Sequence, residues 1–392
     1  MSFLRAARAA LAGQNCFPRI IVALAIVLAA LSTSCGSGGR QIRVPNHNAY
    51  VTLPSEGSVL LLYINGQSGA ITLGAKTPPT LGATPTGLAL LPSRQFLYAI
   101  NSFANTISIF SVNASDGTLA LTGTPTQAGF GPSSAIIDPS GKYLLVTNNF
   151  GNNVSVFAID AGTGALSEVM GSPFFANDNP TEILITPSGQ FVFVTNPGIG
   201  MVTAFKFSSG VLTPVPGTPV FSGSGAGALA IDSSERYLYV ANSAATNPAP
   251  NALTIGNVSG FNIDPTSGAL TPILGSPFTS TASSATGPTA IAVDPGGNFV
   301  YAVSPGSSDS LWCFQITPTN GQLVAVSNSP FSVTAGGLYA LFDPSGGRLY
   351  IGSQSSPGIA GYVYNSSSGA PTAISGSPFS TVVAPGQMVF SE

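Results

Sequence analysis

Short apolar segments alternate with turns of Gly, Pro, Asn and Asp along the whole chain. Residues 138–174 show the pattern most fully: a DPSG turn, an apolar run at residues 143–146, an Asn-rich loop, a second apolar run at residues 154–159, a Gly-centred turn, and a weaker third run ending in GSPF. A further short apolar segment precedes the turn. Four short strands per unit, each bounded by turn residues, predict one blade of a β-propeller.

Copies of this unit recur from one end of the chain to the other. The apolar run after the turn ends at Asn101, Asn148, Asn196, Asn242, Ser304 and Ser353. A partial unit at residues 49–73 lacks the first strand, and residues 385–390 supply a matching segment at the C-terminal end. The sequence therefore predicts an all-β fold, a seven-bladed β-propeller of four-stranded blades whose first blade is closed by the C-terminal strand. Ring closure removes the open sheet edges that a linear stack would expose.

The composition agrees with a ring of covered sheets. The 392-residue chain is 44% hydrophobic but only 6% charged, whereas an average soluble domain has about 25% charged residues. Blades that have neighbours on both sides can be apolar on both faces, as other doubly covered sheets are. The net charge of −3 and the lack of a basic run give nucleic-acid binding no electrostatic support, so we expect no nucleic-acid partner.

Residues 1–34 are interpreted as a signal peptide of the lipoprotein type. Arginines precede an apolar stretch at residues 20–31, and small residues then lead to Cys35. This order predicts export, lipidation of Cys35, and a periplasmic or cell-surface protein anchored to a membrane. Ordinary cleavage before Cys35 and an uncleaved anchor are the alternatives. Residues 35–43 form a flexible linker, and residues 44–392 form the propeller.

The mouth of the central channel is the predicted functional site, because the inner strands begin there. Aligning these strands on the turn gives a column of residues that should line the channel: Gly87, Ser134, Glu182, Ala228, Ala290, Tyr339 and Gln387. Glu182 is the one charged member and therefore the catalytic candidate. A solvated carboxylate at the rim is the alternative interpretation of Glu182.

Polar residues near this mouth are the ligand-binding candidates. They are Asp178, Thr181, Asn148, Asn149, Asn196, Asn242, Asp309, Tyr339 and Gln387. Phe103 and Phe150 offer apolar platforms in the neighbouring loops. The long loops at residues 243–257 and 279–288 are expected to raise the rim over one sector, or else to be tolerated insertions.

The sequence predicts neither a metal site nor a cofactor. His47 is the single histidine, which excludes a multi-histidine metal site and leaves no basis for a Ser-His-Asp relay. Four aspartates occupy the same turn position in separate blades, namely Asp138, Asp232, Asp294 and Asp343. We expect them to hold the turns by accepting local backbone hydrogen bonds.

Several motifs resemble those of the seven-bladed lactonase family, whose members are similar to 6-phosphogluconolactonase and to YVTN-repeat propellers. The motifs are DPSGKYLLVTN, the VSVFAID–TGAL step and the repeated GSPF, and the similarity covers residues 44–392. The resemblance implies lactone hydrolysis, with His and Arg expected where the inner strands begin. Thr181, Glu182, Thr289 and Ala290 stand at those positions here.

Two functions follow from the sequence. The first is a non-catalytic scaffold, tethered to a membrane and expected to be monomeric, that binds a glycan, a peptide or a protein at its loop-rich face. The alternative is a lactone hydrolase that uses Glu182 as its base. Charged groups clustered in the channel would favour catalysis, whereas a lining of Ser, Asn and Gly would favour binding.

Overall fold

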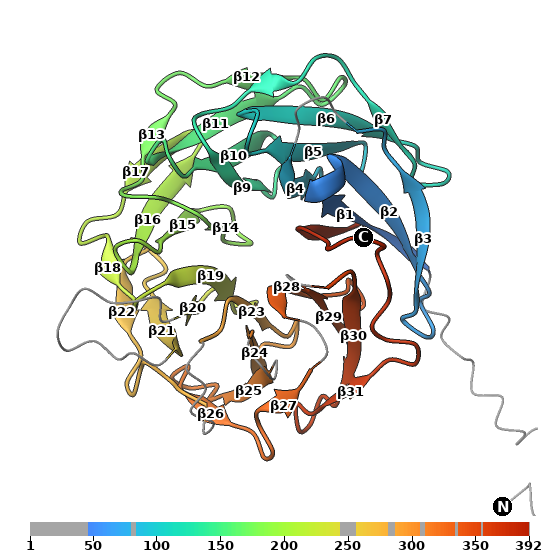
Figure 1. Ribbon diagram of the computed structural model, residues 1–392. Helices are drawn as coiled ribbons and strands as arrows, with labels where there is room; N and C mark the ends of the chain where they lie inside the picture. The colour runs from blue at the N-terminus through green and yellow to red at the C-terminus, as the bar shows by residue number, and fades with distance from the viewer. Residues whose placement is uncertain are drawn as a thin grey trace, which may run out of the picture. The chain divides into compact units, whose positions relative to one another are not determined.

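The strands form seven antiparallel sheets arranged as the blades of a ring (Figure 1). The structure is a computed structural model and describes residues 46–79, 84–243, 256–280, 287–305, 310–333, 336–353 and 356–391. The chain divides into two units, Met1–Arg43 and Val44–Glu392, and the ring belongs to the second. The predicted all-β, seven-bladed propeller is therefore confirmed. Among the described residues, no helix has the length and apolar character that a membrane span requires.

The blades are lettered A to G in chain order, and their strands are given from the inner to the outer edge. Blade A has β32 (Met388–Ser391), β1 (His47–Leu53), β2 (Ser58–Ile64) and β3 (Ile71–Lys76). Blade B has β4 (Pro85–Leu90), β5 (Phe96–Asn101), β6 (Thr106–Val112) and β7 (Leu119–Leu121). Blade C has β9 (Pro132–Ile137), β10 (Tyr143–Asn148), β11 (Asn153–Ile159) and β12 (Leu166–Glu168). Blade D has β14 (Ile183–Ile185), β15 (Phe191–Asn196), β16 (Met201–Ser208) and β17 (Val211–Pro214).

The remaining three blades repeat the same order. Blade E has β19 (Ala226–Ile231), β20 (Tyr237–Asn242), β21 (Asn257–Ile263) and β22 (Leu270–Pro272). Blade F has β23 (Ala290–Val293), β24 (Phe299–Ser304), β25 (Ser310–Ile316) and β26 (Leu323–Ala325). Blade G has β28 (Gly337–Phe342), β29 (Arg348–Ser353), β30 (Ile359–Tyr364) and β31 (Pro371–Ala373).

Two kinds of short element complete the blades. Blades B, C, D and F each carry a two-residue fifth strand paired with the third strand: β8 (Thr126–Gln127), β13 (Phe174–Phe175), β18 (Val220–Phe221) and β27 (Phe331–Ser332). A single-turn 3-10 helix, η1 (Pro54–Glu56), joins β1 to β2. The fifth strands were not predicted, because two residues carry no periodic signal.

The C-terminal strand closes the ring as predicted. β32 pairs antiparallel with β1, with Met388 opposite Val51 and Phe390 opposite Ala49. The Thr52 amide donates to the Gln387 carbonyl oxygen over 2.9 Å, which continues the pairing beyond the strand. Met388 is 2% exposed and packs in a core cluster with residues of blade G. Blade A is thus assembled from both ends of the propeller sequence.

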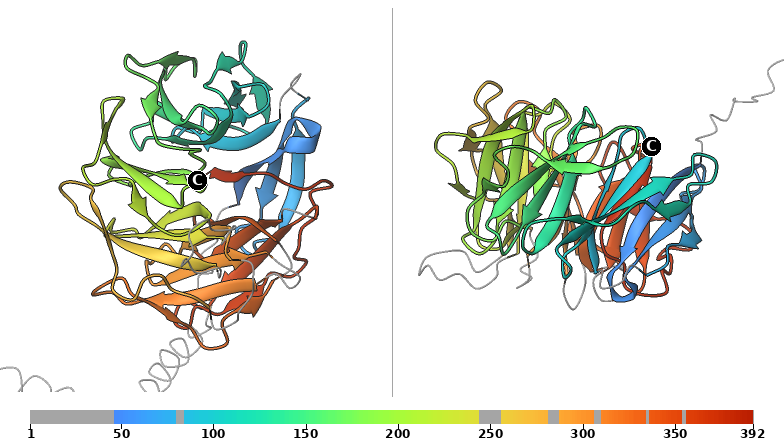
Figure 2. Two further views of the ribbon diagram at one scale, coloured as in Figure 1. Left: turned by 60° about the vertical axis from the view of Figure 1, so that its left-hand side comes forward. Right: turned by 90° about the horizontal axis from the view of Figure 1, so that it is seen from above.

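A hydrophobic cluster fills the space between each pair of neighbouring blades, which Figure 2 shows packed side by side around the ring. The second strands β5, β15, β20, β24 and β29 are buried along their whole length. Because neighbouring blades cover both faces of each sheet, the chain can fold with few charged residues. The turn aspartates act as expected: Asp138 Oδ1 accepts the Lys142 and Tyr143 amides over 2.8 and 2.7 Å.

Buried tyrosine hydroxyls link neighbouring blades. In five of the seven junctions, a tyrosine on the second strand donates to a glycine carbonyl oxygen in the outer turn of the next blade: Tyr50 to Gly117, Tyr98 to Gly164, Tyr239 to Gly321, Tyr301 to Gly369 and Tyr350 to Gly69. Leu145 and Phe193 occupy the repeat position in blades C and D. The bond from Tyr350 to Gly69, over 2.7 Å, secures the junction at which the ring closes.

Replacing Tyr350 with Phe is expected to lower the free energy of unfolding by about 1–3 kcal/mol, because the buried Gly69 carbonyl would lose its partner. Urea denaturation followed by circular dichroism measures the change. Tyr63→Phe is the matched control, since that side chain is 38% exposed and water can replace its partner. Equal effects of the two substitutions would contradict a structural role for the Tyr350 hydroxyl.

Candidate functional site

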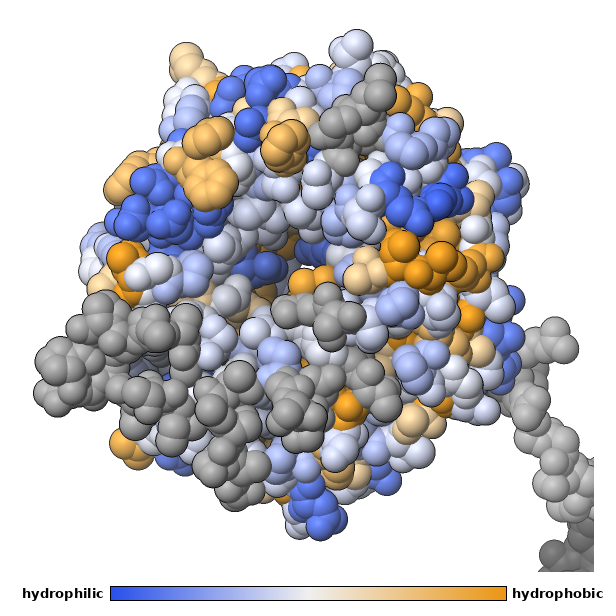
Figure 3. Space-filling model, in the orientation of Figure 1, coloured by the Kyte–Doolittle hydropathy of each residue, from blue (hydrophilic) through white to orange (hydrophobic). Residues whose placement is uncertain are grey.

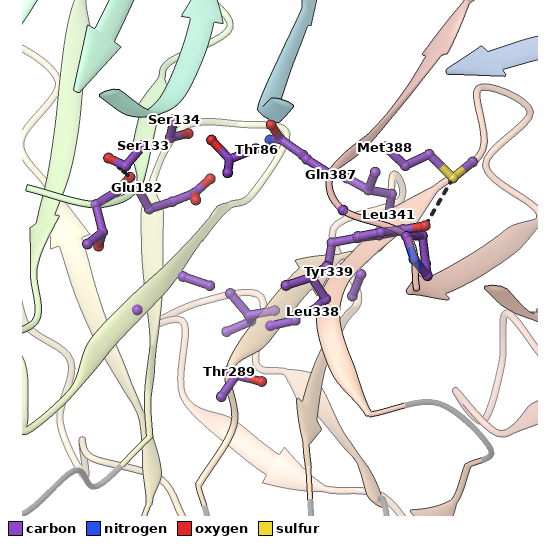
Figure 4. Close-up of a pocket in the computed structure, with 18 of the residues that line it drawn as sticks. Thr86, Ser133, Ser134, Glu182, Thr289, Leu338, Tyr339, Leu341, Gln387 and Met388 are labelled. Carbon is purple, nitrogen blue, oxygen red and sulfur yellow. Dashed lines mark hydrogen bonds between the residues drawn. The ribbon is translucent and has the colours of Figure 1, made fainter. Parts of the chain in front are cut away.

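A cavity of about 750 Å³ lies in the central channel. Six inner strands contribute to its wall, and blade D contributes the residues just before its inner strand β14. The wall also includes Pro54 and Ser55 of η1, Pro197 after β15 and Ser243 after β20. These residues belong to loops that follow second strands, so the cavity lies at the face where the sequence placed the mouth. Figure 4 shows its polar side chains converging from different blades.

The predicted column lines this cavity almost completely. Ser134, Glu182, Ala228, Ala290, Tyr339 and Gln387 are all part of the wall, as is Thr181. Gly87 is not among the lining residues, but its neighbour Thr86 is. Aligning the inner strands on the repeated turn therefore located the channel surface from the sequence alone.

Among the lining residues that the structure describes, Glu182 is the only one with a carboxylate side chain, and it points into the cavity from the position just before β14 (Figure 4). Its side chain keeps some contact with the channel while protein surrounds it on the other sides. Burial raises the pKa of Glu182 from 4.5 to about 7, because the charged form loses hydration. No hydrogen bond or ion pair of its carboxylate is found within the described part of the chain. A carboxyl group of this kind titrates near neutral pH and is free to engage a ligand.

A network of hydroxyl groups fixes the backbone around Glu182. The Thr195 hydroxyl accepts the Glu182 amide over 3.1 Å and lies 3.0 Å from the Thr181 hydroxyl. Ser133 of blade C donates to the Thr181 carbonyl oxygen of blade D over 3.0 Å. These bonds join two blades at the point where their inner strands begin. The carboxylate is therefore presented from a rigid base, which suits recognition or catalysis.

The opposite wall is built around Gln387, Met388 and Tyr339. Gln387 Oε1 accepts the Leu88 amide over 2.8 Å, so the C-terminal segment is joined to blade B as well as to β1. The Tyr339 hydroxyl donates to Met388 Sδ over 3.5 Å. Burial raises the pKa of Tyr339, which stays protonated at physiological pH. This side presents mainly apolar surface to a ligand.

The remaining asparagine candidates do not line the cavity. Asn148, Asn196 and Asn242 are buried, and each bonds to a hydroxyl on the third strand of its own blade. The amides of Asn196 and Asn242 also donate to carbonyl oxygens in the preceding inter-blade connections, at Ala176 and Ser222. Asn148 donates to Ser155 Oγ over 3.0 Å, Asn196 accepts the Thr203 hydroxyl over 2.7 Å, and Asn242 donates to Ser259 Oγ over 3.0 Å. This repeated contact between an Asn and a hydroxyl on the third strand joins the second and third strands at one end of blades C, D and E.

The remaining predicted site residues lie in three different settings: near the cavity, away from its wall, or outside the described part of the chain. Asn149 donates to the Pro180 carbonyl oxygen over 3.4 Å, next to the cavity residue Thr181. Asp178 accepts an Asn196 bond through its backbone carbonyl oxygen and is not part of the cavity wall. Asp309 and Cys35 lie outside the described residues, as do most residues of the loop at 243–257. Thr289, which stands where the family resemblance implies a site residue, also lines the wall. Ser133 is a wall residue that was not predicted from the sequence, although its place beside Ser134 gave the signal.

The described cavity wall contains no Lys, Arg or His. Across the described residues, no group of three or more His, Cys, Asp or Glu side chains is arranged to hold a metal ion. His47 lies at the start of β1, with its ring 5.8 Å from that of Phe390. What the site offers chemically is one carboxyl group that titrates near neutrality, several hydroxyls and an apolar wall.

The family model for the seven-bladed β-propeller lactonases matches residues 23–184 and 176–384. The chain belongs to this lactonase family. A 6-phosphogluconolactonase of Formosa agariphila is 45% identical over 66 residues, a stretch that spans 17% of this chain and 18% of that protein. The family assignment confirms the resemblance carried by the blade motifs.

Solved structures of other members have the same fold at low sequence identity. A Bacteroides fragilis protein provisionally assigned as a 6-phosphogluconolactonase superimposes with a TM-score of 0.73 at 20% identity, covering 88% of this chain and 98% of its own. A periplasmic gluconolactonase of Pseudomonas aeruginosa gives a TM-score of 0.66 at 19% identity, covering 89% of this chain and 99% of its own. These two structures establish the shared architecture.

Proposed function

We propose that this lactonase-family propeller binds an uncharged, hydroxyl-bearing ligand of sugar type in its central channel. The observation that carries the proposal is the wall itself: one carboxyl group, several Ser and Thr hydroxyls, and no cationic side chain among the described lining residues. Such a wall forms hydrogen bonds with a polyol and gives a phosphate group no counter-charge. A cavity of about 750 Å³ has the size of small-molecule sites in general.

Calorimetric titration of the propeller with neutral monosaccharides (glucose, galactose, mannose and xylose) and with gluconate and 6-phosphogluconate tests this assignment. At least one neutral sugar should bind, and 6-phosphogluconate should bind far more weakly. Preferential binding of the phosphorylated acid would overturn the proposal.

A substitution that fills the cavity locates the ligand. Ala228 lies on β19 with its side chain partly exposed in the wall, so Ala228→Phe should place a ring in the channel. We expect sugar affinity to fall at least tenfold, about 1.4 kcal/mol, with little change in melting temperature. Val211→Phe, at an exposed position on outer strand β17, is the matched control and should bind normally. Unchanged affinity of Ala228→Phe would place the ligand elsewhere.

Lactone hydrolysis is the second candidate, and the elevated pKa of Glu182 favours it. The ionised carboxylate would take a proton from water, whose oxygen would bond to the lactone carbonyl carbon. The ring C–O bond would then break and the ring oxygen would recover the proton from Glu182, which leaves a hydroxy acid. An unphosphorylated lactone suits the wall better than a phosphorylated one. Comparing hydrolysis of glucono-1,5-lactone and 6-phosphogluconolactone by the wild type and by Glu182→Gln decides between binding and catalysis.

We also propose export and membrane tethering through a lipid on Cys35. The support is the sequence alone, with arginines, an apolar stretch and small residues before the cysteine. Cys35→Ala should abolish incorporation of a labelled fatty acid and shift the protein from the membrane to the soluble fraction. Retention of the label in Cys35→Ala would refute lipidation at this residue.

A further inference from the structure

Two exposed aromatic rings lie in loops at the face where the channel opens. Phe130 and Phe150 are 63% and 66% exposed, and their ring centroids are 5.5 Å apart. Phe130 lies between β8 and β9, and Phe150 lies between β10 and β11. Figure 3 shows apolar side chains on this face above the hollow, over blades B and C. Adjacent exposed rings are costly in water and commonly mark a binding surface.

The pair is held in place by its backbone. The Asn149 amide donates to the Gly131 carbonyl oxygen over 2.8 Å, and the Gly151 amide donates to the Phe130 carbonyl oxygen over 3.0 Å. Gly131 has φ of +68°, and a Cβ there would lie 2.4 Å from the Phe150 ring. Glycine is therefore required for the ring to lie across this turn. The two loops are therefore held together by backbone hydrogen bonds in a conformation that leaves both rings exposed.

The pair is continuous with the channel. Phe130 precedes the wall residue Ser133 by three positions, so their Cα atoms are at most about 11 Å apart. On the other loop, Asn149 donates to the Pro180 carbonyl oxygen, next to the wall residues Thr181 and Glu182. The two loops that carry the rings therefore adjoin the cavity wall, at Ser133 and at Thr181.

The chemistry of the surrounding loops points to a carbohydrate. Residues 101–105, 128–134, 148–153 and 176–182 contain several asparagines and serines and only two charged residues, Asp178 and Glu182. Sugar rings present C–H groups to an aromatic face and hydroxyls to amide and carboxylate partners around it. A charged peptide would find no cationic partner in these segments, and a purely apolar one would leave the amides unused.

We propose that the Phe130–Phe150 pair is a second sugar subsite, so that the channel and the rim together bind an extended neutral oligosaccharide with one unit in the mouth and the next stacked on the rings. This inference rests on the proposed binding of a neutral sugar in the channel. Stacking would bury roughly 50–60 Å² of apolar ring surface. An oligosaccharide long enough to reach the rings should therefore bind about tenfold more tightly than a monosaccharide.

The experiment is calorimetric titration with gluco-, manno- and xylo-oligosaccharides of one to six units. Wild-type affinity should rise about tenfold between one unit and three units in at least one series. Phe150→Ala and Phe150→Leu should abolish that rise while monosaccharide affinity stays at the wild-type value. Phe150→Trp should retain the rise, since a flat face is preserved. Phe175→Ala, an equally exposed position on β13, is the matched control and should behave as the wild type.

The outcomes separate this inference from the proposal on which it depends. Monosaccharide binding without any dependence on chain length would overturn the rim subsite and leave the channel assignment standing. A length dependence that survives in Phe150→Leu would also overturn it, because apolar contact without stacking would then suffice. Failure of the wild type to bind any monosaccharide or oligosaccharide would overturn both.

Discussion

Removal of residues 388–392 is expected to abolish cooperative folding of the whole propeller. The deletion takes away β32 and with it Met388, Val389 and Phe390, whose burial contributes roughly 4–6 kcal/mol. It also leaves the inner edge of β1 without a partner, where β32 now pairs from Asn48 to Val51. A total stability of about 5–15 kcal/mol cannot absorb this loss together with an open sheet edge.

The measurement is circular dichroism during thermal unfolding, combined with size-exclusion chromatography of the truncated chain. We expect no sharp transition and a shift toward aggregates. Met388→Ala in the full chain is the graded comparison and should cost about 2–5 kcal/mol while the native fold is kept. A synthetic peptide of residues 384–392 added in trans should restore the transition, since strand addition would rebuild the blade. A truncated chain that melts like the intact one would show that β32 does not close the ring.

The architecture was predictable because similar turn and strand sequences recur from blade to blade. The turn, the apolar strand that follows it and the GSPF segments recur along the chain, with one longer interval between Asn242 and Ser304, so errors at single positions average out. Closure by residues 385–390 was also readable, since this segment matches the start of other blades. The channel wall followed from the same alignment, which placed Glu182, Tyr339 and Gln387 on one surface.

The individual roles of polar residues were harder to predict, because a repeat position carries no information about burial depth. Asn148 and Asn242 end the equivalent apolar strands of blades C and E and were predicted to lie at the mouth. Their amides instead bond to Ser155 and Ser259 on the third strands. The partners are separated by seven and seventeen residues, so the pairing becomes visible only when the strands are folded together.

The Phe130–Phe150 contact was also not predictable from the sequence. Phe150 was singled out from the sequence, whereas Phe130 was not, because it lies in a different inter-strand loop of the chain. Their contact depends on hydrogen bonds between two loops and on the conformation of Gly131. Three-dimensional proximity, rather than residue type, turns an exposed phenylalanine into part of a candidate site.

Glu182→Gln is expected to stabilise the propeller increasingly as the pH rises from 4 to 8. Burial places the pKa of Glu182 at about 7 in the folded state, against 4.5 ordinarily. Below pH 4.5 the group is neutral in both states and costs nothing. Between these values the unfolded chain loses the proton first, so the folded state becomes relatively less stable, and above pH 7 the penalty is complete. Because the side chain keeps contact with the channel, we expect roughly 1–3 kcal/mol in total.

Urea denaturation of the wild type and of Glu182→Gln at five pH values measures this difference directly. Ser134→Ala, a neutral change in the same cavity wall, is the control, and its effect should not vary with pH. A difference between Glu182→Gln and the wild type that is constant from pH 4 to 8 would show that the carboxyl group is not buried in the channel wall.

The same substitution separates a sugar-binding channel from a lactonase. If Glu182 acts as the general base, the rate of glucono-1,5-lactone hydrolysis should rise about tenfold per pH unit below 7 and level off above it, because only the ionised form accepts a proton. Glu182→Gln should then lower the rate by about 10²–10⁴-fold and remove the inflection. If the channel only binds, the wild type should hydrolyse the lactone no faster than buffer, and Glu182→Gln should weaken sugar binding roughly 10–100-fold, as expected for loss of a hydrogen bond to a charged group. Lactone hydrolysis with the same pH profile in the wild type and in Glu182→Gln would exclude this carboxylate as the base, and equal sugar affinity of the two proteins would exclude it from binding.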